Sequence, residues 1–389
     1  MTTARLTFVV VLAAAAACHS SRRSTVFGHL SGGVDAERTE TTVLDIATGE
    51  LLEVSVTYGN VEVRTRRDAS PGVVATIRAG GRSDEEAARV AAAYSVAVER
   101  AGRTVRVSVA GEPTRVHDAD ARLSLGAMVD LAITVPEGVE LRVDTRSGDI
   151  VGAGPFGPCR VETRYGGVSL EHVAGDVAAR SDSGDVVVRH ATDGDVSAES
   201  GYGSVRLEDI AAPAVRAASK SGDVVVVGAR VGTMELDTHY GAVSVSGADG
   251  DLRAATRSGD IDVIGMHGAV NARSQYGQVV VEGVLTGLAA KSSSGRVTAR
   301  ALEGSTNLVD WELSSGYGDV VLQVPPGFGC QLVASTRHGE IGCELPIDLP
   351  AGRRRSGALK GTVGNGGRTV SLQSSSGNLS LRSIAATEM

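Results

Sequence analysis

A glycine recurs ten times behind a residue that alternates strictly between serine and tyrosine. The series begins at Ser147-Gly148 and ends at Tyr317-Gly318, with glycines at 148, 166, 184, 203, 222, 241, 259, 277, 295 and 318. Successive glycines are 18 or 19 residues apart, except for a last step of 23 residues. A fixed period of this length is typical of stacked repeat folds, in which each unit buries its apolar side only against its neighbours.

The segment before each glycine alternates between buried-type and polar residues, which predicts a β-strand with one buried face. Representative buried-face triplets are Leu141-Val143-Thr145, Val215-Ala217-Ser219 and Leu252-Ala254-Thr256. A second short strand follows each glycine, and a second turn completes the repeat. We therefore predict an all-β chain in which residues 139–382 form a parallel β-solenoid with about 18–19 residues per coil. The competing arrangement has about two periods per coil, with the Ser and Tyr corners on opposite sides.

The residue before each glycine has the same parity as the buried positions of its strand. Because successive side chains of a strand point to opposite faces, this parity predicts that the Ser and Tyr side chains fill the corners from inside. Exposed aromatic rows stack sugars or bind partner proteins, so a surface binding row is the alternative for the tyrosines. They are Tyr165, Tyr202, Tyr240, Tyr276 and Tyr317.

Aspartates follow the glycine at four Ser-type corners, namely Asp149, Asp185, Asp223 and Asp260. In a stack they would lie on every second coil, about 9.6 Å apart. A calcium ladder is one interpretation, but Ca²⁺ needs six or more oxygens that converge on one point. We therefore interpret the aspartates as a structural row and expect no metal site.

Basic residues precede several corners. Arg146, Lys220 and Arg257 stand directly before Ser-Gly-Asp, so each is expected to pair with the aspartate across the turn. Other basic residues extend the row without a matching acid, and such a row attracts anionic glycans or lipid head groups. The candidate surface-binding residues are Arg164, His239, Arg257 and Arg337. The alternative is a solvated face without a ligand.

Residues 41–138 are less regular and are expected to cap the first coil. Ser83-Asp84-Glu85-Glu86 has the capping-box pattern of a helix N-terminus, and the residues up to Ala93 continue it. This is the one short helix that the sequence predicts. At the other end we expect degenerate corners at Gly339 and Gly357 before a last corner at Gly377, and a tail over residues 383–389.

The N-terminus has the pattern of an export signal. Arg5 precedes a largely apolar stretch over residues 6–17, which is too short to span a bilayer but suits a signal-peptide core. The small residues before Cys18 resemble a bacterial lipobox, so we predict a signal peptide over residues 1–18 and lipidation of Cys18, with an ordinary cleavage site as the alternative. Residues 19–40 lack periodicity and are predicted to be a flexible tether. These features predict an exported protein, lipid-anchored in the cell envelope.

Three cysteines follow Cys18 in the chain. Disulfides persist in exported proteins, and Cys330 with Cys343 form the favoured pair, which leaves Cys159 over. No CxxC or closely spaced histidines accompany them, so neither a metal nor another cofactor is expected. The cluster His117-Asp118-Ala119-Asp120 is interpreted as a solvated loop.

The sequence has no G-x-S-x-G, phosphate-binding loop or zinc motif, so we expect a protein that is not an enzyme. A carbohydrate-active enzyme is the rival hypothesis. Its cleft would lie at the insertion over residues 304–310, with Asp310 or Glu312 as the acid. Trp311, beside this insertion, has the parity of a core residue. The formal net charge of −8 argues against nucleic-acid binding.

The corners S-G-D-[VI] and Y-G-x-V, together with P-E-G-V-x-L-x-V-x-T at residues 136–145, resemble a bacterial family known as putative adhesins. The resemblance covers residues 50–382 and includes the closing Ser-Gly-Asn-Leu-Ser-Leu at 376–381. It implies a β-strand repeat domain at the cell surface or envelope and defines no catalytic residues. We therefore expect a non-enzymatic exported envelope protein that acts as a scaffold or an adhesin-like binding module. Its expected partners are the membrane, through the N-terminal lipid, and a glycan or envelope protein; an envelope-sensing regulatory partner is the remaining alternative.

Overall fold

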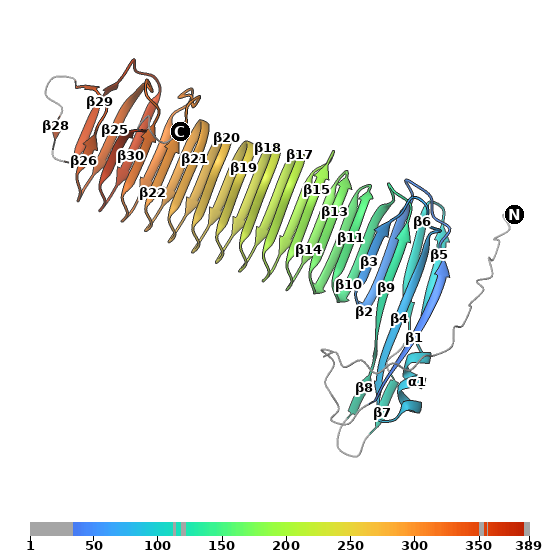
Figure 1. Ribbon diagram of the computed structural model, residues 1–389. Coiled ribbons are helices and arrows are strands. Elements are labelled where there is room, and N and C mark those ends of the chain that lie inside the picture. The colour runs from blue at the N-terminus through green and yellow to red at the C-terminus, as the bar shows by residue number, and fades with distance from the viewer. Residues whose placement is uncertain (1–33, 112–113, 118–121, 350–353, 356, 385–389) are drawn as a thin grey trace. The chain divides into compact units, whose positions relative to one another are not determined.

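The computed structural model describes residues 34–111, 114–117, 122–349, 354–355 and 357–384, and every structural statement below concerns these residues. They belong to two compact units, residues 1–174 and residues 175–389. Strands make up nearly all of the regular structure, and one helix lies in the first unit (Figure 1). The prediction of an all-β chain with one short helix is confirmed. Within these ranges no helix is long and apolar enough to cross a membrane.

The first unit is a short parallel stack whose outer edge is covered by antiparallel strands. Its strands are β1 (Val34–Val43), β2 (Leu51–Tyr58), β3 (Val61–Thr65), β4 (Gly72–Gly81), β5 (Ser95–Ala101), β6 (Thr104–Ala110), β7 (Thr114–His117), β8 (Arg122–Leu125), β9 (Ala127–Val135), β10 (Glu140–Ser147), β11 (Ile150–Phe156), β12 (Cys159–Tyr165) and β13 (Val168–Ala174). β6, β2, β10 and β12 pair in parallel in this order, and β9, β3, β11 and β13 form a second parallel series. β5 covers β6, β4 covers β9 and β1 covers β4, all antiparallel, so their hydrogen-bonding groups are occupied. The capping role of residues 41–138 stays a prediction.

Strand β1 begins inside the segment that the sequence predicted to be a tether. It pairs with β4 over its whole length, from Val34 to Val43, so the tether prediction is wrong for residues 34–40. None of its side chains is fully buried. An edge strand of this kind needs no apolar alternation, which explains why hydrophobic periodicity did not reveal it.

Helix α1 (Asp84–Ala92) begins at the predicted capping box. The hydroxyl of the N-cap Ser83 accepts a hydrogen bond from the backbone N–H of Glu86 at 3.3 Å, and the carboxylate of Glu86 accepts one from the backbone N–H of Arg82 at 2.8 Å. These bonds satisfy N–H groups that have no partner within the first turn. The buried side chains of Ala87 and Val90 face strands β4 and β1.

The second unit is a parallel β-solenoid in which each corner glycine marks one coil. Its strands are β14 (Val177–Ser181), β15 (Val186–Thr192), β16 (Val196–Ser200), β17 (Val205–Ser219), β18 (Val224–Thr238), β19 (Val243–Thr256), β20 (Ile261–Ser274), β21 (Val279–Ser292), β22 (Val297–Ala301), β23 (Trp311–Ser315), β24 (Val320–Val324), β25 (Cys330–Thr336), β26 (Ile341–Cys343), β27 (Ile347–Asp348), β28 (Arg354–Arg355), β29 (Ala358–Val363), β30 (Thr369–Ser374) and β31 (Leu379–Ser383). In the parallel ladders Ser219 pairs with Thr238, Thr238 with Thr256 and Thr256 with Ser274. Partners are thus 18 or 19 residues apart, which confirms the predicted coil and rules out the coil of two periods.

The last coils of this unit do not stack in chain order. Strand β30 pairs in parallel with both β23 and β25, and β31 pairs with both β24 and β26. The coil at 369–383 therefore lies between the coils at 311–324 and 330–343. The expected order of corners is wrong, since Gly377 stacks on Gly318, Gly339 stacks on Gly377, and Gly357 precedes the antiparallel strand β29. β29 covers the outer edge of β25 and so protects the end of the stack.

A buried Ser or Thr three residues before the glycine closes most corners of the second unit. The Thr238 hydroxyl donates a hydrogen bond to the carbonyl oxygen of Gly222 in the preceding coil at 2.9 Å and accepts one from the N–H of Gly241 at 3.2 Å. The same two bonds recur at Ser200, Ser219, Thr256, Ser274, Ser292 and Ser315. These hydroxyls satisfy backbone groups at the point where the strand ladder ends.

The corner glycines stack too closely for any side chain. A Cβ atom placed on Gly241 would lie 2.1 Å from the carbonyl oxygen of Gly222, and one on Gly222 would lie 2.2 Å from that of Gly203. The requirement is one of close backbone approach. The glycine recurs in the sequence because each coil requires it where its corner stacks on the preceding corner.

The aspartate row has the structural role that the sequence predicted. A side-chain oxygen of Asp223 accepts a hydrogen bond from the backbone N–H of Ala242 in the next coil at 2.8 Å. Asp149, Asp185 and Asp260 bind the corresponding N–H groups at 2.7–2.8 Å. The ion pairs expected across the turn with Arg146, Lys220 and Arg257 are not formed in the described part of the chain, because the carboxylates bind backbone N–H groups instead.

Candidate functional site

The corner tyrosines lie on the surface, so the prediction that they fill the corners is wrong. In the second unit the exposed fractions are 71% for Tyr202, 63% for Tyr240, 60% for Tyr276 and 72% for Tyr317. The strand ends at the buried Ser or Thr two residues earlier, as β18 does at Thr238. Strand alternation therefore no longer applies at the corner, and the side chain before the glycine points outward.

These four tyrosines form one row along the edge of the second unit. The pairing of β16 with β17 and of β17 with β18 places Ser221 in the coil between Tyr202 and Tyr240. The ladders from β18 to β23 place Ser258 and Ser294 in the same way between the later tyrosines. Parallel strands lie about 4.8 Å apart, so neighbouring tyrosines are about 9.6 Å apart along the row. We call this set of tyrosines and intervening serines the tyrosine row.

The structure brings together only part of the predicted basic row. Lys220, His239 and Arg257 are exposed and occupy the same place in three successive coils, each directly before a corner residue of the tyrosine row. Arg337 occupies the equivalent place five coils further along, and Arg164 lies in the first unit. Surface binding by Arg164, His239, Arg257 and Arg337 stays a prediction.

A shallow hollow of about 310 Å³ lies beside the tyrosine row, on the outer face of β14, β16, β17 and β18. Ala218 lines it, and in the strand ladder Ala218 stands between Glu199 and Asp237. Ala218 is shorter than both of these neighbours, so its methyl group leaves a gap between them. The sequence contains no local signal for this hollow, because its walls come from four different coils.

Charged side chains form the walls of the hollow and partly neutralise one another. Arg180 pairs with Glu199 at 3.4 Å, and Arg216 pairs with Glu235 at 3.6 Å. The hollow is lined in addition by Asp182, Lys220, Asp237 and His239. Four carboxylates thus face three permanent cations, which leaves one formal negative charge when the histidine is neutral. The arrangement can donate and accept hydrogen bonds without imposing a strong field of one sign.

The three described cysteines are free thiols, so the disulfide expected between Cys330 and Cys343 is not formed in this structure and stays a prediction. Burial raises the pKa of the Cys159 thiol to about 12. Burial, followed by the charge of Cys343, raises the pKa of Cys330 to about 12 as well. Burial also raises the pKa of Cys343. All three thiols are therefore protonated and poorly nucleophilic at neutral pH. The lipidation candidate Cys18 and the acids of the cluster at 117–120 lie outside the described residues.

The acids of the rival enzyme hypothesis hold coils together. A carboxylate oxygen of Asp310 accepts a hydrogen bond from the backbone N–H of Thr369 at 2.9 Å. Glu312 forms an ion pair with Lys291 at 2.6 Å. Trp311 is fully buried, as the sequence predicted, and its ring centroid lies 5.2 Å from that of Phe328. The insertion thus has a clear structural use.

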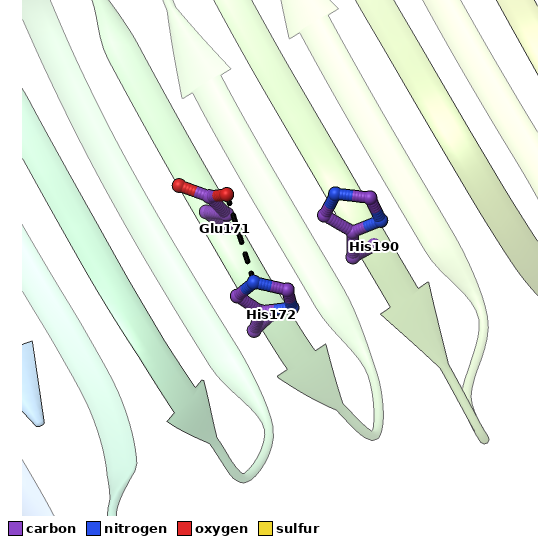
Figure 2. Close-up of side chains that lie close together, drawn as sticks. All are labelled: Glu171, His172 and His190. Carbon is purple, nitrogen blue, oxygen red and sulfur yellow. Dashed lines mark ion pairs between the residues drawn. The ribbon is translucent and has the colours of Figure 1, made fainter.

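Two histidines occupy an unusual backbone conformation that sequence patterns do not reveal. His172 in the first unit and His190 in the second, whose side chains are drawn in Figure 2, both have φ in the left-handed region. The φ angles are 58° for His172 and 53° for His190. His172 lies 3.6 Å from the carboxylate of Glu171, and His190 lies 3.6 Å from that of Asp209. In later coils of the second unit the place of Asp209 is taken by Gly228 and Gly247, whose φ angles are also positive. The bend thus requires a left-handed residue, for which glycine is the least strained choice.

Comparison with known proteins identifies the family of the chain. Solved structures that resemble it include a putative cell adhesion protein from Clostridium sporogenes (7% identity, 90% of this chain and 100% of that chain covered, TM-score 0.18) and a putative adhesin from Parabacteroides distasonis (11%, 90% and 97%, 0.27). A third is a putative lipid binding protein from Parabacteroides distasonis (15%, 92% and 98%, 0.25). Among curated proteins, none matches the chain. Residues 76–282, more than half of the 389 residues, match the family described as Toastrack DUF4097, and the chain therefore belongs to this family.

Proposed function

We propose that this chain is a non-enzymatic, exported protein of the bacterial cell envelope that serves as a binding module or scaffold. One observation carries the binding role, namely the row of tyrosine rings that are 60–72% exposed along one edge of the second unit. Serine occupies the same place in alternate coils, so the corner itself does not need a ring. Tyrosine combines an apolar ring with a polar tip, a combination that is enriched at binding surfaces.

Anchoring through a lipid on Cys18 is part of the same proposal. The apolar stretch at residues 6–17 and the small residues before Cys18 support it. A lipid at this position would hold the described units at a membrane through the residues that precede β1. Radiolabelled palmitate should enter the unaltered chain and not a Cys18→Ser variant; equal labelling of both would remove the anchor from the proposal.

The non-enzymatic role is supported by the acids at the insertion. Asp310 binds a backbone N–H and Glu312 pairs with Lys291, so both already have a structural partner. A hydrolase would need an acid placed to donate or accept a proton at a substrate. The evenly distributed charge pairs of the second unit resemble a solvated, repeated surface rather than such a site.

Sedimentation with isolated envelope fractions tests the binding role. The full chain with Cys18→Ser cannot be lipidated, so its sedimentation reports on binding by the folded surface alone. Combining Tyr202→Ser, Tyr240→Ser, Tyr276→Ser and Tyr317→Ser in this background should abolish sedimentation. The far-UV circular dichroism spectrum should not change, because serine is the natural residue of alternate corners. Unchanged sedimentation of the combined variant would contradict the proposal.

A further inference from the structure

The hollow beside the tyrosine row has the features of a ligand site. It is a concavity of about 310 Å³ on the outer face of β14, β16, β17 and β18. Its gap exists because Ala218 stands in the outward row that also contains Glu199 and Asp237. Concave sites with a few converging polar groups are the usual location of small-ligand binding.

Three polar side chains at the hollow are available to a ligand. Within the residues that the structure describes, the side chains of Lys220, Asp237 and His239 have neither an ion-pair nor a hydrogen-bond partner, although all three line the hollow. Lys220 donates hydrogen bonds, Asp237 accepts them, and His239 can do either. Hydroxyl groups both donate and accept, so a ligand rich in hydroxyls can satisfy this mixed set.

The charge of the hollow argues for an uncharged ligand. Its four carboxylates would repel a polyanion, and its three permanent cations would repel a polycation. The pairs Arg180–Glu199 and Arg216–Glu235 are already compensated and frame the hollow without a net field. This balance distinguishes the hollow from a simple basic patch, even though Lys220 and His239 contribute to it.

Two exposed tyrosines directly follow residues that line the hollow. Gly201 and His239 both line it, and Tyr202 and Tyr240 directly follow them in the chain. Both rings are mostly exposed, at 71% and 63%. Aromatic rings pack against the C–H faces of pyranose sugars, while polar groups beside them bind the hydroxyls. Exposed rings next to a hollow whose charges nearly balance and whose polar groups can bind hydroxyls fit a saccharide.

We propose that the hollow around Ala218, together with Tyr202 and Tyr240, binds an uncharged saccharide segment of an extended, β-linked glycan. The inference deepens the binding role proposed above and rests on it. The tyrosines recur at intervals on the order of 10 Å, two strand separations, which is the length of a disaccharide in an extended chain. Tyr276 and Tyr317 then contact the same glycan beyond the hollow. A single chain thus follows the tyrosine row.

Calorimetric titration with chitohexaose and cellohexaose tests the proposal, using the full chain with Cys18→Ser. Maltohexaose has similar composition but a coiled shape and serves as the ligand control. We expect binding of at least one of the two β-linked hexamers, no binding of maltohexaose, and an affinity that changes little with salt. Absence of binding by both β-linked hexamers, or equal binding of maltohexaose, would overturn the proposal.

Substitution of Ala218 locates the site. Ala218→Arg fills the hollow and places a cation between Glu199 and Asp237, where Arg180 shows that the row accepts arginine. Ala255→Arg is the matched control, since Ala255 occupies the same row next to Asp237 but does not line the hollow. We expect Ala218→Arg to abolish binding and Ala255→Arg to leave it within about twofold. Equal effects of the two substitutions would refute the location.

Substitutions of Tyr202 and Tyr240 distinguish the contribution of the rings to binding from that of the hollow. Tyr202→Ser and Tyr240→Ser should each weaken binding by roughly three- to tenfold, the range of an aromatic contact. Unchanged affinity in both would overturn the role of the rings. If the sugars fail to bind while the unsubstituted chain still sediments with envelope fractions, the saccharide site is refuted and the broader binding role stands. If sedimentation fails as well, the broader role fails too.

Discussion

Replacing Thr238 with valine isolates the hydrogen bonds that close one corner. Valine has nearly the shape of threonine, so the substitution preserves packing while it removes the hydroxyl. Thr238 is 1% exposed. Its hydroxyl donates to the Gly222 carbonyl oxygen at 2.9 Å and accepts from the Gly241 N–H at 3.2 Å. The variant therefore leaves one buried acceptor and one buried donor without their partner.

The expected cost follows from these two orphaned groups. Each buried polar group that loses its hydrogen bond costs about 1–3 kcal/mol, which gives about 2–6 kcal/mol for the pair. A methyl group at 2.9 Å from a carbonyl oxygen is also closer than a C–H···O contact of about 3.3–3.6 Å allows. The control Thr238→Ser keeps both bonds and removes one buried methyl group, at a cost of about 1 kcal/mol. The order of stability should be unaltered chain, then serine, then valine.

Urea unfolding followed by circular dichroism should show this order in the transition midpoints. Because repeat arrays can unfold in parts, amide hydrogen exchange of the segment around Gly241 is the more local measurement. We expect the valine variant to exchange faster there than the serine variant, by at least about tenfold for each 1.4 kcal/mol of difference. A valine variant as stable as the serine variant would refute the view that the hydroxyls close the corners.

Three further predictions follow from the stacking and from the thiols. Gly222→Ala should prevent correct folding of the second unit, because the added Cβ atom would lie 2.2 Å from the Gly203 carbonyl oxygen. The control Ser221→Ala changes the exposed neighbouring residue and should leave stability nearly unchanged. The yield of soluble, folded protein and the thermal melting curve compare the two variants. In reduced protein, Cys159 and Cys330 should resist alkylation at about pH 8 until urea is added, because only the thiolate reacts and the pKa of both thiols is about 12. Rapid labelling of the folded chain would contradict the burial of these thiols. The same shift predicts lower stability in alkali. The buried Cys159 thiol contributes fully to the free energy of unfolding below the ordinary thiol pKa of 9.0. This contribution is lost as the pH rises towards 12, because the thiol ionises first in the unfolded chain. In thermal melts across this pH range, Cys159→Ala should therefore lose less stability with rising pH than the unaltered chain.

Periodicity made the coil predictable. The spacing of Gly222, Gly241 and Gly259 matches the register of the ladder because each glycine contacts the backbone of the preceding one. Strand alternation located the buried face because successive side chains of a strand point to its two opposite faces. The capping box at Ser83 predicted the helix because its bonds are local in sequence.

These local sequence patterns did not predict the features that depend on contacts between coils. Alternation holds only within a strand, so it failed for Tyr240, which lies two residues past the end of β18. The order of the terminal coils failed because the degenerate repeats carry no information on which neighbour they pair with. The sequence also contained no signal for the hollow at Ala218, because Glu199 and Asp237, which stand on either side of Ala218, come from adjacent coils.

The sequence by itself determined the period, the buried face and the places where backbones touch, since all three are recorded in spacings along one chain. Only the tertiary structure decided which side chains the stack leaves on its surface. The corner hydroxyls of Thr238 and its equivalents close the coil from inside, and this turns the tyrosines outward. The physical reason is that a hydrogen bond between coils joins residues about 16 positions apart, and no local pattern specifies which side chain makes it.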